Sequence, residues 1–265
     1  MQLDIYFVDA FTDNIFSGNP AAVIFTDLDD KSTMQKIAAE NNLSETAFVN
    51  LSNKNLIRWF SPLKEVDLCG HATLASAYIY FNYLDKKAES ICFNSASGEL
   101  IVNKKDKFLQ LDFPKDEFQL TNDINSVESA VGVAPIQTYK GTINLMAVYE
   151  KEEDILKLSP DYQKVIGLDG QGLIVTAPGF HCDFVSRYFC PKYGINEDPV
   201  TGSAHTTLIP CWSERLNKNL LTAKQISKRG GDLFCENADN RVLIGGSAVL
   251  YLSLIHISEP TRHNA

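Results

Sequence analysis

Two short polar turns hold the residues of this chain that could do chemistry. One is Asp67–Thr73, Asp-Leu-Cys-Gly-His-Ala-Thr, and the other is Asp198–His205, Asp-Pro-Val-Thr-Gly-Ser-Ala-His. Each combines carboxylate, imidazole or hydroxyl groups with a glycine and runs into small, apolar residues, which predicts a helix start. The first N–H groups of a helix are unpaired and lie at the positive end of its dipole. Two such ends facing each other would bind an anion the size of a carboxylate.

The same aromatic strand precedes both turns. Arg58–Pro62 is Arg-Trp-Phe-Ser-Pro, and Arg187–Pro191 is Arg-Tyr-Phe-Cys-Pro. The copies lie roughly 130 residues apart, about half of the chain, so they predict two similar lobes rather than a short-period repeat. A duplicated packing unit would leave the same pattern. Arg58 and Arg187 could clamp a substrate or pair with surface acids, and the sequence supports both interpretations.

Glu45 and His71 are the candidates for proton transfer. Glu45 lies where a helix expected over 34–41 gives way to an apolar strand. A carboxylate held in a cleft with little water would have a raised pKa, as a general base near neutral pH requires. The alternative is a solvated loop acid. His71 is either a residue of a helix cap, satisfied by backbone groups, or an acid of the site.

The elements around these turns are expected to bury them. The helix expected over 66–81 is apolar on nearly every face, so it should run through the centre of one lobe, and 206–216 should do the same in the other. Strand patterns surround both helices, over 3–10, 56–61, 90–113, 184–189 and 241–252. Residues 114–125 are acidic and lack periodicity, and we take them as the connection between lobes.

Composition excludes several kinds of partner. The chain has 265 residues and a net charge of −9, which disfavours binding to nucleic acid. It starts without the pattern of a secretory signal and has no apolar run that could span a bilayer, which favours a cytoplasmic protein that binds no membrane. The six cysteines form no Cys-x-x-Cys pair, so we expect reduced thiols and no metal site. Cys69, beside a helix start, is expected to have a lowered pKa.

Four segments, in this order, resemble the signature of the PhzF family, the phenazine-biosynthesis-like isomerases. They are Gly18–Val23, Asn42–Phe48, Cys69–Thr73 and Asp198–His205, and the similarity runs from about Met1 to Tyr251. The resemblance implies an α+β fold of two similar lobes, each a strongly curved, mostly antiparallel sheet or barrel around a central helix, as in diaminopimelate epimerase. The active site would lie between the lobes. The corresponding division is 1–117 for the N-terminal lobe, 118–252 for the C-terminal lobe and 253–265 for a tail that does not match the family, which we attribute to cloning or a faulty gene end.

The resemblance also implies the roles of single residues. Its catalytic groups would be Glu45, His71 and Asp198, and its substrate contacts would come from Asn19, Gly70, Ala72, Gly202 and Ser203. Glu45 would move a proton between carbons of a small carboxylic acid, without a cofactor or metal, in a homodimer. One alternative is an amino-acid epimerase or racemase that uses Glu45 with Cys69, and another is a catalytically silent binding protein of the same fold. The turn at Asp198–His205 has no thiol, which disfavours the two-thiol racemisation of related enzymes.

Overall fold

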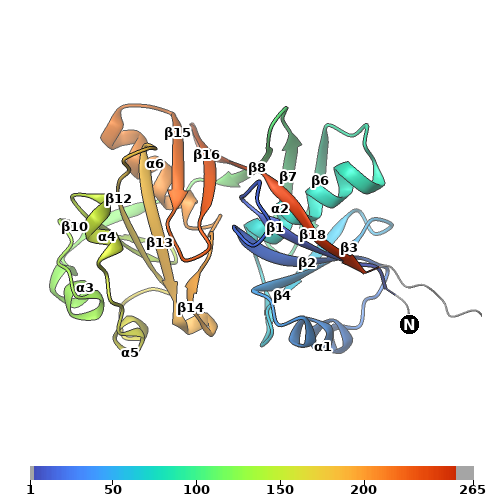
Figure 1. Ribbon diagram of the computed structural model, residues 1–265, viewed down its shortest axis with the longest axis horizontal. Helices are drawn as coiled ribbons and strands as arrows, with labels where there is room; N and C mark the ends of the chain where they lie inside the picture. Colours follow the sequence, from blue (N-terminus) through green and yellow to red (C-terminus); the bar gives the residue numbers. More distant parts are fainter. Residues whose placement is uncertain (1–2, 255–265) are drawn as a thin grey trace, which may run out of the picture.

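The computed structural model describes residues 3–254, in two halves that lie side by side (Figure 1). In each half a curved, mostly antiparallel sheet wraps around one buried helix, so the predicted α+β fold with two similar lobes is confirmed. The two halves share one continuous sheet, because β8 (Leu109–Pro114) of the first lobe pairs antiparallel with β17 (Arg241–Gly246) of the second.

The first lobe surrounds α2 (Gly70–Ile79), nine of whose ten residues are buried. The helix begins at the Gly70-His71 turn, as the sequence of 66–81 indicated, and Glu65–Val66 forms the short strand β5 before that turn. The lobe also contains β1 (Ile5–Ala10), β2 (Asn19–Phe25), α1 (Lys31–Asn41), β3 (Glu45–Asn50), β4 (Leu56–Phe60), the π-helical turn η1 (Tyr80–Leu84), β6 (Ser90–Ser95) and β7 (Gly98–Lys104).

The second lobe repeats this order around α6 (His205–Leu216). In both lobes a parallel pair of strands, β2 with β3 or β11 with β12, is followed by an antiparallel strand, β4 or β13, that carries the Arg-aromatic-Phe sequence. The elements are β9 (Phe118–Thr121), α3 (Ile124–Val131), β10 (Gln137–Gly141), β11 (Leu145–Val148), α4 (Glu152–Leu156), α5 (Tyr162–Ile166), β12 (Leu173–Pro178), β13 (Phe184–Cys190), the 3-10 turn η2 (Pro191–Tyr193), β14 (Ile195–Asp198), β15 (Leu220–Gln225) and β16 (Gly231–Ala238).

Two segments differ from their sequence-based assignment. The last strand, β18 (Ala248–Leu254), pairs with β1 and so joins the first lobe, although the sequence division put residues up to 252 in the second. Its register places Ile5 opposite Leu254, so the first two residues of the expected tail belong to a strand; residues 255–265 lie outside the described part. The connection expected over 114–125 contains β9 and the start of α3, which leaves Lys115–Glu117 as the link between β8 and β9.

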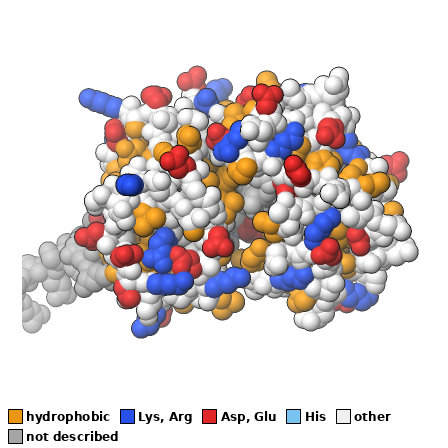
Figure 2. Space-filling view, turned by 180° about the vertical axis from the view of Figure 1, so that it is seen from behind, with side chains coloured by type: hydrophobic (Ala, Val, Ile, Leu, Met, Phe, Trp, Pro, Cys, Tyr) orange, Lys and Arg blue, Asp and Glu red, His pale blue; other side chains and the backbone are white. Residues whose placement is uncertain are grey.

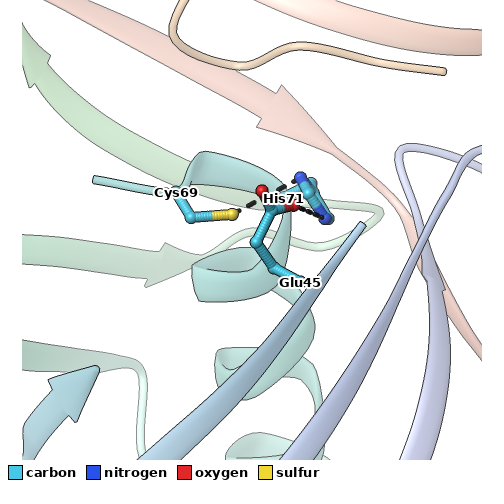
Figure 3. A group of neighbouring side chains, drawn as sticks. All are labelled: Glu45, Cys69 and His71. Carbon is cyan, nitrogen blue, oxygen red and sulfur yellow. Dashed lines mark hydrogen bonds and ion pairs between the residues drawn. The ribbon is translucent and has the colours of Figure 1, made fainter. Parts of the chain in front are cut away.

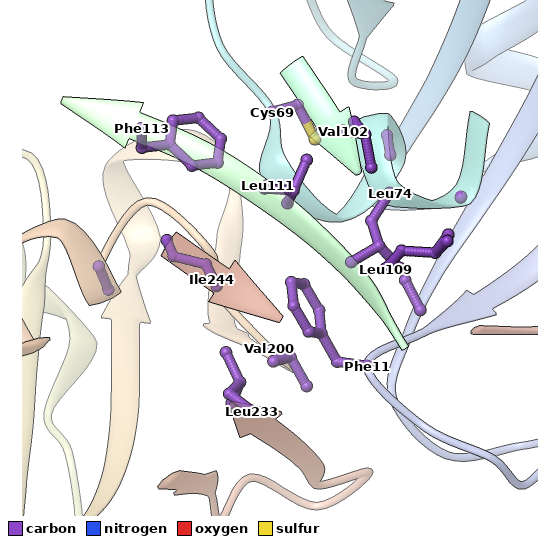
Figure 4. Packing of buried hydrophobic residues seen from close by; sticks show 14 of the residues in the cluster. Phe11, Cys69, Leu74, Val102, Leu109, Leu111, Phe113, Val200, Leu233 and Ile244 are labelled. Atoms are coloured by element: carbon purple, nitrogen blue, oxygen red, sulfur yellow. The ribbon is translucent and has the colours of Figure 1, made fainter. Parts of the chain in front are cut away.

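Phe11 fills the junction of the lobes. It follows β1, is fully buried and adopts a left-handed backbone with φ 63°, a conformation that bulky residues rarely take. Its backbone N–H donates to the Ser247 carbonyl and its carbonyl accepts from the Asp232 N–H. Any side chain at Gly246 would collide with its ring. One hydrophobic cluster therefore runs through both lobes, with Phe11 between residues of each (Figure 4).

The two buried helices begin against each other. A Cβ atom at Gly70 would lie 3.3 Å from the Cα atom of Gly202, and one at Gly202 would lie 3.4 Å from the Cα atom of Gly70. These distances are shorter than most contacts of real Cβ atoms, so the approach of the two backbones depends on the missing side chains.

We predict that Gly202→Ala lowers the free energy of unfolding by about 1–3 kcal/mol, the usual cost of an extra methyl group in a packed site. Ser203→Ala, at the next position, is the control and should change it by less than about 0.5 kcal/mol. Urea unfolding measures both, through the midpoint at constant slope. Equal midpoints for the two variants would show that the helix starts have room to separate.

Candidate active site

A cavity of about 730 Å³ lies between the lobes, at the two helix starts. The space-filling view shows the molecule hollowed where the lobes meet (Figure 2). Six of the eight predicted site residues line it, three from each lobe. Glu45, Gly70 and His71 belong to the first lobe, and Asp198, Gly202 and Ser203 belong to the second. The sequence motifs therefore converge on one cavity, as the resemblance implied.

Glu45 is the first residue of β3 and reaches this cavity from the edge of the first lobe. Its side chain is 16% exposed, so the alternative of a solvated loop acid is wrong. Burial raises its pKa to about 8, the charge of Asp198 adds to the shift, and a hydrogen bond with Cys69 opposes it. Near neutral pH this carboxyl group can both take up and release a proton.

His71, in the first turn of α2, lies beside Glu45 (Figure 3). Burial lowers the pKa of its imidazole to about 3, so the ring is neutral. Its Nε2 atom is 3.3 Å from Glu45 Oε2, but the contact is not aligned as a hydrogen bond, and among the described residues Nε2 has no hydrogen-bond partner. Its Nδ1 atom lies 3.1 Å from Asn19 Nδ2 and 3.5 Å from Cys69 Sγ.

Asp198, the last residue of β14, faces His71 across the lobe boundary. Its Oδ1 accepts from Asn19 Nδ2 at 2.9 Å, and its Oδ2 accepts from the hydroxyl of Thr201. Both bonds favour the charged form, but burial outweighs them and raises the pKa of Asp198 to about 6. Asn19 also donates to the carbonyl of Val200 at 2.8 Å, so one buried amide connects His71 of the first lobe with the Asp198 turn of the second.

The helix starts supply the backbone N–H groups expected for an anion. The first residues of α2 are Gly70, His71 and Ala72, whose N–H groups have no partner one turn earlier in the helix. Before α6, Gly202 and Ser203 form a turn that accepts from the N–H groups of His205 and Thr206. Two positive helix ends therefore border the cavity beside two carboxyl groups.

Asn19 and Ala72 do not contact the cavity in the described part of the chain. Both side chains are fully buried, and Ala72 belongs to the hydrophobic core around α2. Their predicted role as substrate contacts stays a prediction, and neither side chain lines the cavity. Asn19 instead lies behind His71 and Asp198 and holds them.

The two arginines of the repeat do not clamp a substrate. Arg58 forms a two-pronged ion pair with Glu65, with bonds of 2.7 and 3.2 Å, and Arg187 forms the same pair with Glu197, at 2.7 and 2.8 Å. Neither arginine lines the cavity. Pairing with a neighbouring acid was the alternative to substrate binding that the sequence left open, and both lobes show it.

The lowered pKa expected for Cys69 is also wrong. Its thiol is buried next to Glu45, and both burial and that carboxylate raise its pKa well above 9. The helix start still donates toward the sulfur through the N–H of Ala72, but this bond is the weaker effect. Cys69 is therefore a neutral thiol that hydrogen-bonds Glu45.

Sequence reasoning missed Tyr188 and Cys190, which line the cavity from β13. The register explains their place. Leu173 pairs with Phe189 as Thr46 pairs with Phe60, so Gly172 stands where the first lobe has Glu45. The ring of Tyr188 fills the space that a side chain at Gly172 would need, and its hydroxyl donates to Asn144 Oδ1 at 2.9 Å. Their equivalents in the first copy, Trp59 and Ser61, do not line the cavity, so the repeat alone would not have indicated them.

The fold defines a class of protein, that of diaminopimelate epimerase and proline racemase. A probable proline racemase from Agrobacterium radiobacter has this fold, with a TM-score of 0.61 at 8% identity over 98% of this chain and 94% of that one. A crystal structure of a phenazine biosynthesis protein of the PhzF family from Enterococcus faecalis is far more similar, with a TM-score of 0.92 at 47% identity over 96% and 98% of the two chains.

The model of the phenazine biosynthesis-like protein family matches residues 8–253. An uncharacterized isomerase of Pseudomonas aeruginosa is 48% identical over 256 residues, which cover 96% of this chain and 98% of that protein. The chain belongs to the phenazine biosynthesis-like (PhzF) family and is an enzyme of the isomerase class. Within residues 3–254 no helix is long and apolar enough to cross a membrane.

The raised pKa of Glu45 predicts a pH-dependent stability. The folded chain binds the Glu45 proton more tightly than the unfolded chain, so this contribution is present below the ordinary glutamate pKa and is lost as the pH rises through about 8. Relative to wild type, Glu45→Gln should therefore gain a few kcal/mol of unfolding free energy between about pH 5 and about pH 9. Urea titrations across this range measure the gain. Glu40→Gln, at an exposed position, is the control, and a Glu45→Gln curve parallel to it would contradict the burial argument.

Proposed function

We propose that this enzyme moves a proton between two carbon atoms of a small carboxylic acid and that Glu45 carries the proton. The observation that supports this most is the position of Glu45, whose pKa is raised to about 8, in a cavity bordered by two helix starts. The N–H groups of those starts would hold the substrate carboxylate and stabilise negative charge as a neighbouring C–H bond breaks. No step in this scheme needs a cofactor or metal.

The ionised form of Glu45 would take the proton, and the neutral carboxyl would return it to another carbon. His71 and Asp198 would orient the substrate or assist the transfer, and Ser203 would bind a carboxylate or hydroxyl group. Asn19 donates to Asp198 and lies against His71 Nδ1, which favours a proton on Nε2, the nitrogen that points toward Glu45. We also propose that the enzyme works as a cytoplasmic homodimer.

A second candidate function is an amino-acid epimerase. It is favoured by the two thiols of the cavity, Cys69 from the first lobe and Cys190 from the second. Burial raises the pKa of both thiols, which keeps them protonated near neutral pH, so neither is ready to accept a proton, and this candidate stands behind the first. Incorporation of solvent deuterium with inversion at the α-carbon would favour the epimerase. Binding of an acid without any exchange by wild type would favour a silent binding protein.

Glu45→Gln should abolish proton exchange and leave binding intact, because the amide keeps the shape of the carboxyl and cannot accept the proton. A panel of small carboxylic acids is first screened by thermal shift, since a ligand of the folded state raises the melting temperature. Each acid that binds is then incubated in deuterated water and followed by proton NMR. Exchange at the wild-type rate in Glu45→Gln would remove this residue from the mechanism.

Tyr188→Phe should weaken binding of the same acids by about 3–10-fold, the effect of one lost hydrogen bond, and leave exchange measurable. The ring still fills the space beside Gly172, so the fold should persist. Tyr149→Phe is the matched control, because the Tyr149 hydroxyl also lies in the second lobe and donates to the Val133 carbonyl outside the cavity. Equal affinities for Tyr188→Phe and Tyr149→Phe would mean that the Tyr188 hydroxyl touches no ligand.

A further inference from the structure

The cavity floor gathers three metal-binding side chains. Glu45, Cys69 and His71 each present one ligand atom, and these atoms lie within 4.8 Å of one another (Figure 3). They come from only two places in the chain, the start of β3 and the turn before α2. Carboxylate, thiolate and imidazole together are a donor set typical of zinc.

The spacing agrees with a tetrahedral ion. Zinc bonds of about 2.0–2.3 Å place neighbouring ligand atoms about 3.5 Å apart. Cys69 Sγ is 3.5 Å from His71 Nδ1, and Glu45 Oε2 is 3.3 Å from His71 Nε2. The two contacts use opposite nitrogens of the ring, so a shared ion requires Glu45, Cys69 or His71 to rotate until one ring nitrogen faces the other two donors. With one ligand atom per residue, the three donors already lie within 4.8 Å of one another.

His71 is available as a ligand. It is 4% exposed, and its Nε2 atom has no hydrogen-bond partner among the described residues although it is buried at the cavity. Three acceptors surround Asn19 Nδ2. His71 Nδ1 is the most distant, at 3.1 Å, whereas Asp198 Oδ1 lies at 2.9 Å and the Val200 carbonyl at 2.8 Å. An amide has two N–H bonds, so Asn19 does not fully engage this nitrogen.

The two lysines that line the cavity have partners other than this cluster. The ammonium group of Lys64 lies 5.2 Å from the centre of the Tyr193 ring, and that of Lys115 lies 3.5 Å from the carbonyl of Asp239. A further carboxyl group, that of Asp198, lines the same cavity. A divalent cation at the cluster would therefore have a second carboxyl group in the same cavity.

We propose that Glu45, Cys69 and His71 form a zinc site through which zinc reversibly inhibits the enzyme. The metal binds the sulfur as thiolate and Glu45 as carboxylate, and the protons of the thiol and of the carboxyl group pass to solvent. Three protein ligands leave the fourth position open toward the cavity. Zinc occupies the oxygen of Glu45 that would accept a substrate proton, so the metal-bound form has no free base. The site itself rests on side-chain geometry, and only the inhibition rests on the proposed function.

Titration of metal-free protein with cobalt and zinc tests the site without a substrate. Cobalt should give one thiolate-to-cobalt charge-transfer band per chain, and zinc should displace it with one equivalent. Calorimetry should show that the affinity for zinc falls by roughly 100-fold or more in Cys69→Ser and in His71→Gln. Replacing a residue that only hydrogen-bonds a metal ligand already lowers metal affinity by about 10–100-fold. Cys190→Ser, in the same cavity, and Cys92→Ser, outside it, should bind like wild type.

Several results would overturn the zinc site. They are absence of the cobalt band in wild type, a band kept by Cys69→Ser, and a band lost in Cys190→Ser. Circular dichroism shows whether each variant is folded. If a variant does not fold, anomalous scattering at the zinc edge locates the ion in crystals of the wild-type protein instead. For any acid that exchanges deuterium, zinc should stop the exchange and a chelator should restore it. Exchange unaffected by bound zinc would refute the inhibition and leave the site standing.

Discussion

The close approach of two helix starts is the constraint on which the rest of this structure depends. Gly70 and Gly202 meet with almost no space for a Cβ atom on either side, so the unpaired N–H groups of α2 and of the turn before α6 border one cavity. Because those groups carry partial positive charge, they can balance the buried carboxyl groups of Glu45 and Asp198. Neither Arg58 nor Arg187 has this task, since neither lines the cavity and each is engaged in an ion pair, with Glu65 and Glu197 respectively.

Holding the helix starts together requires connections between the lobes, and three kinds are present. β8 pairs with β17, and β18 returns to pair with β1. Phe11 packs at the junction of the two lobes. The third connection is polar, because the amide of Asn19 reaches from β2 to Asp198 and Val200 of the second lobe. This last link is also the one that contacts His71, so the position of a site residue depends on the fit of the lobes.

The sequence predicted what its local patterns encode, and missed what depends on pairing or burial. The two turns contain His71, Asp198 and the helix-start glycines in consecutive residues, and the repeat indicated two lobes around two helices. Nothing local shows that β18 pairs with β1, because strand partners are chosen by distant residues. Cys69 illustrates the other limit. The expected effect of the helix start on its pKa is present, but the loss of water and the neighbouring carboxyl are larger.

The duplication also leaves the two lobes with different side chains at equivalent positions. Equivalent positions hold Glu45 and Gly172, and His71 and Ser203, so the carboxyl group whose pKa is raised to about 8 has no counterpart in the second lobe. The second lobe offers Tyr188, whose pKa is raised by burial, as a hydrogen-bonding group. Racemisation by two bases needs a proton acceptor on each side of one carbon atom, whereas an isomerisation can use one base that takes a proton from one carbon and returns it to another. The asymmetry of the two copies therefore favours a proton shift carried by a single carboxyl group over inversion.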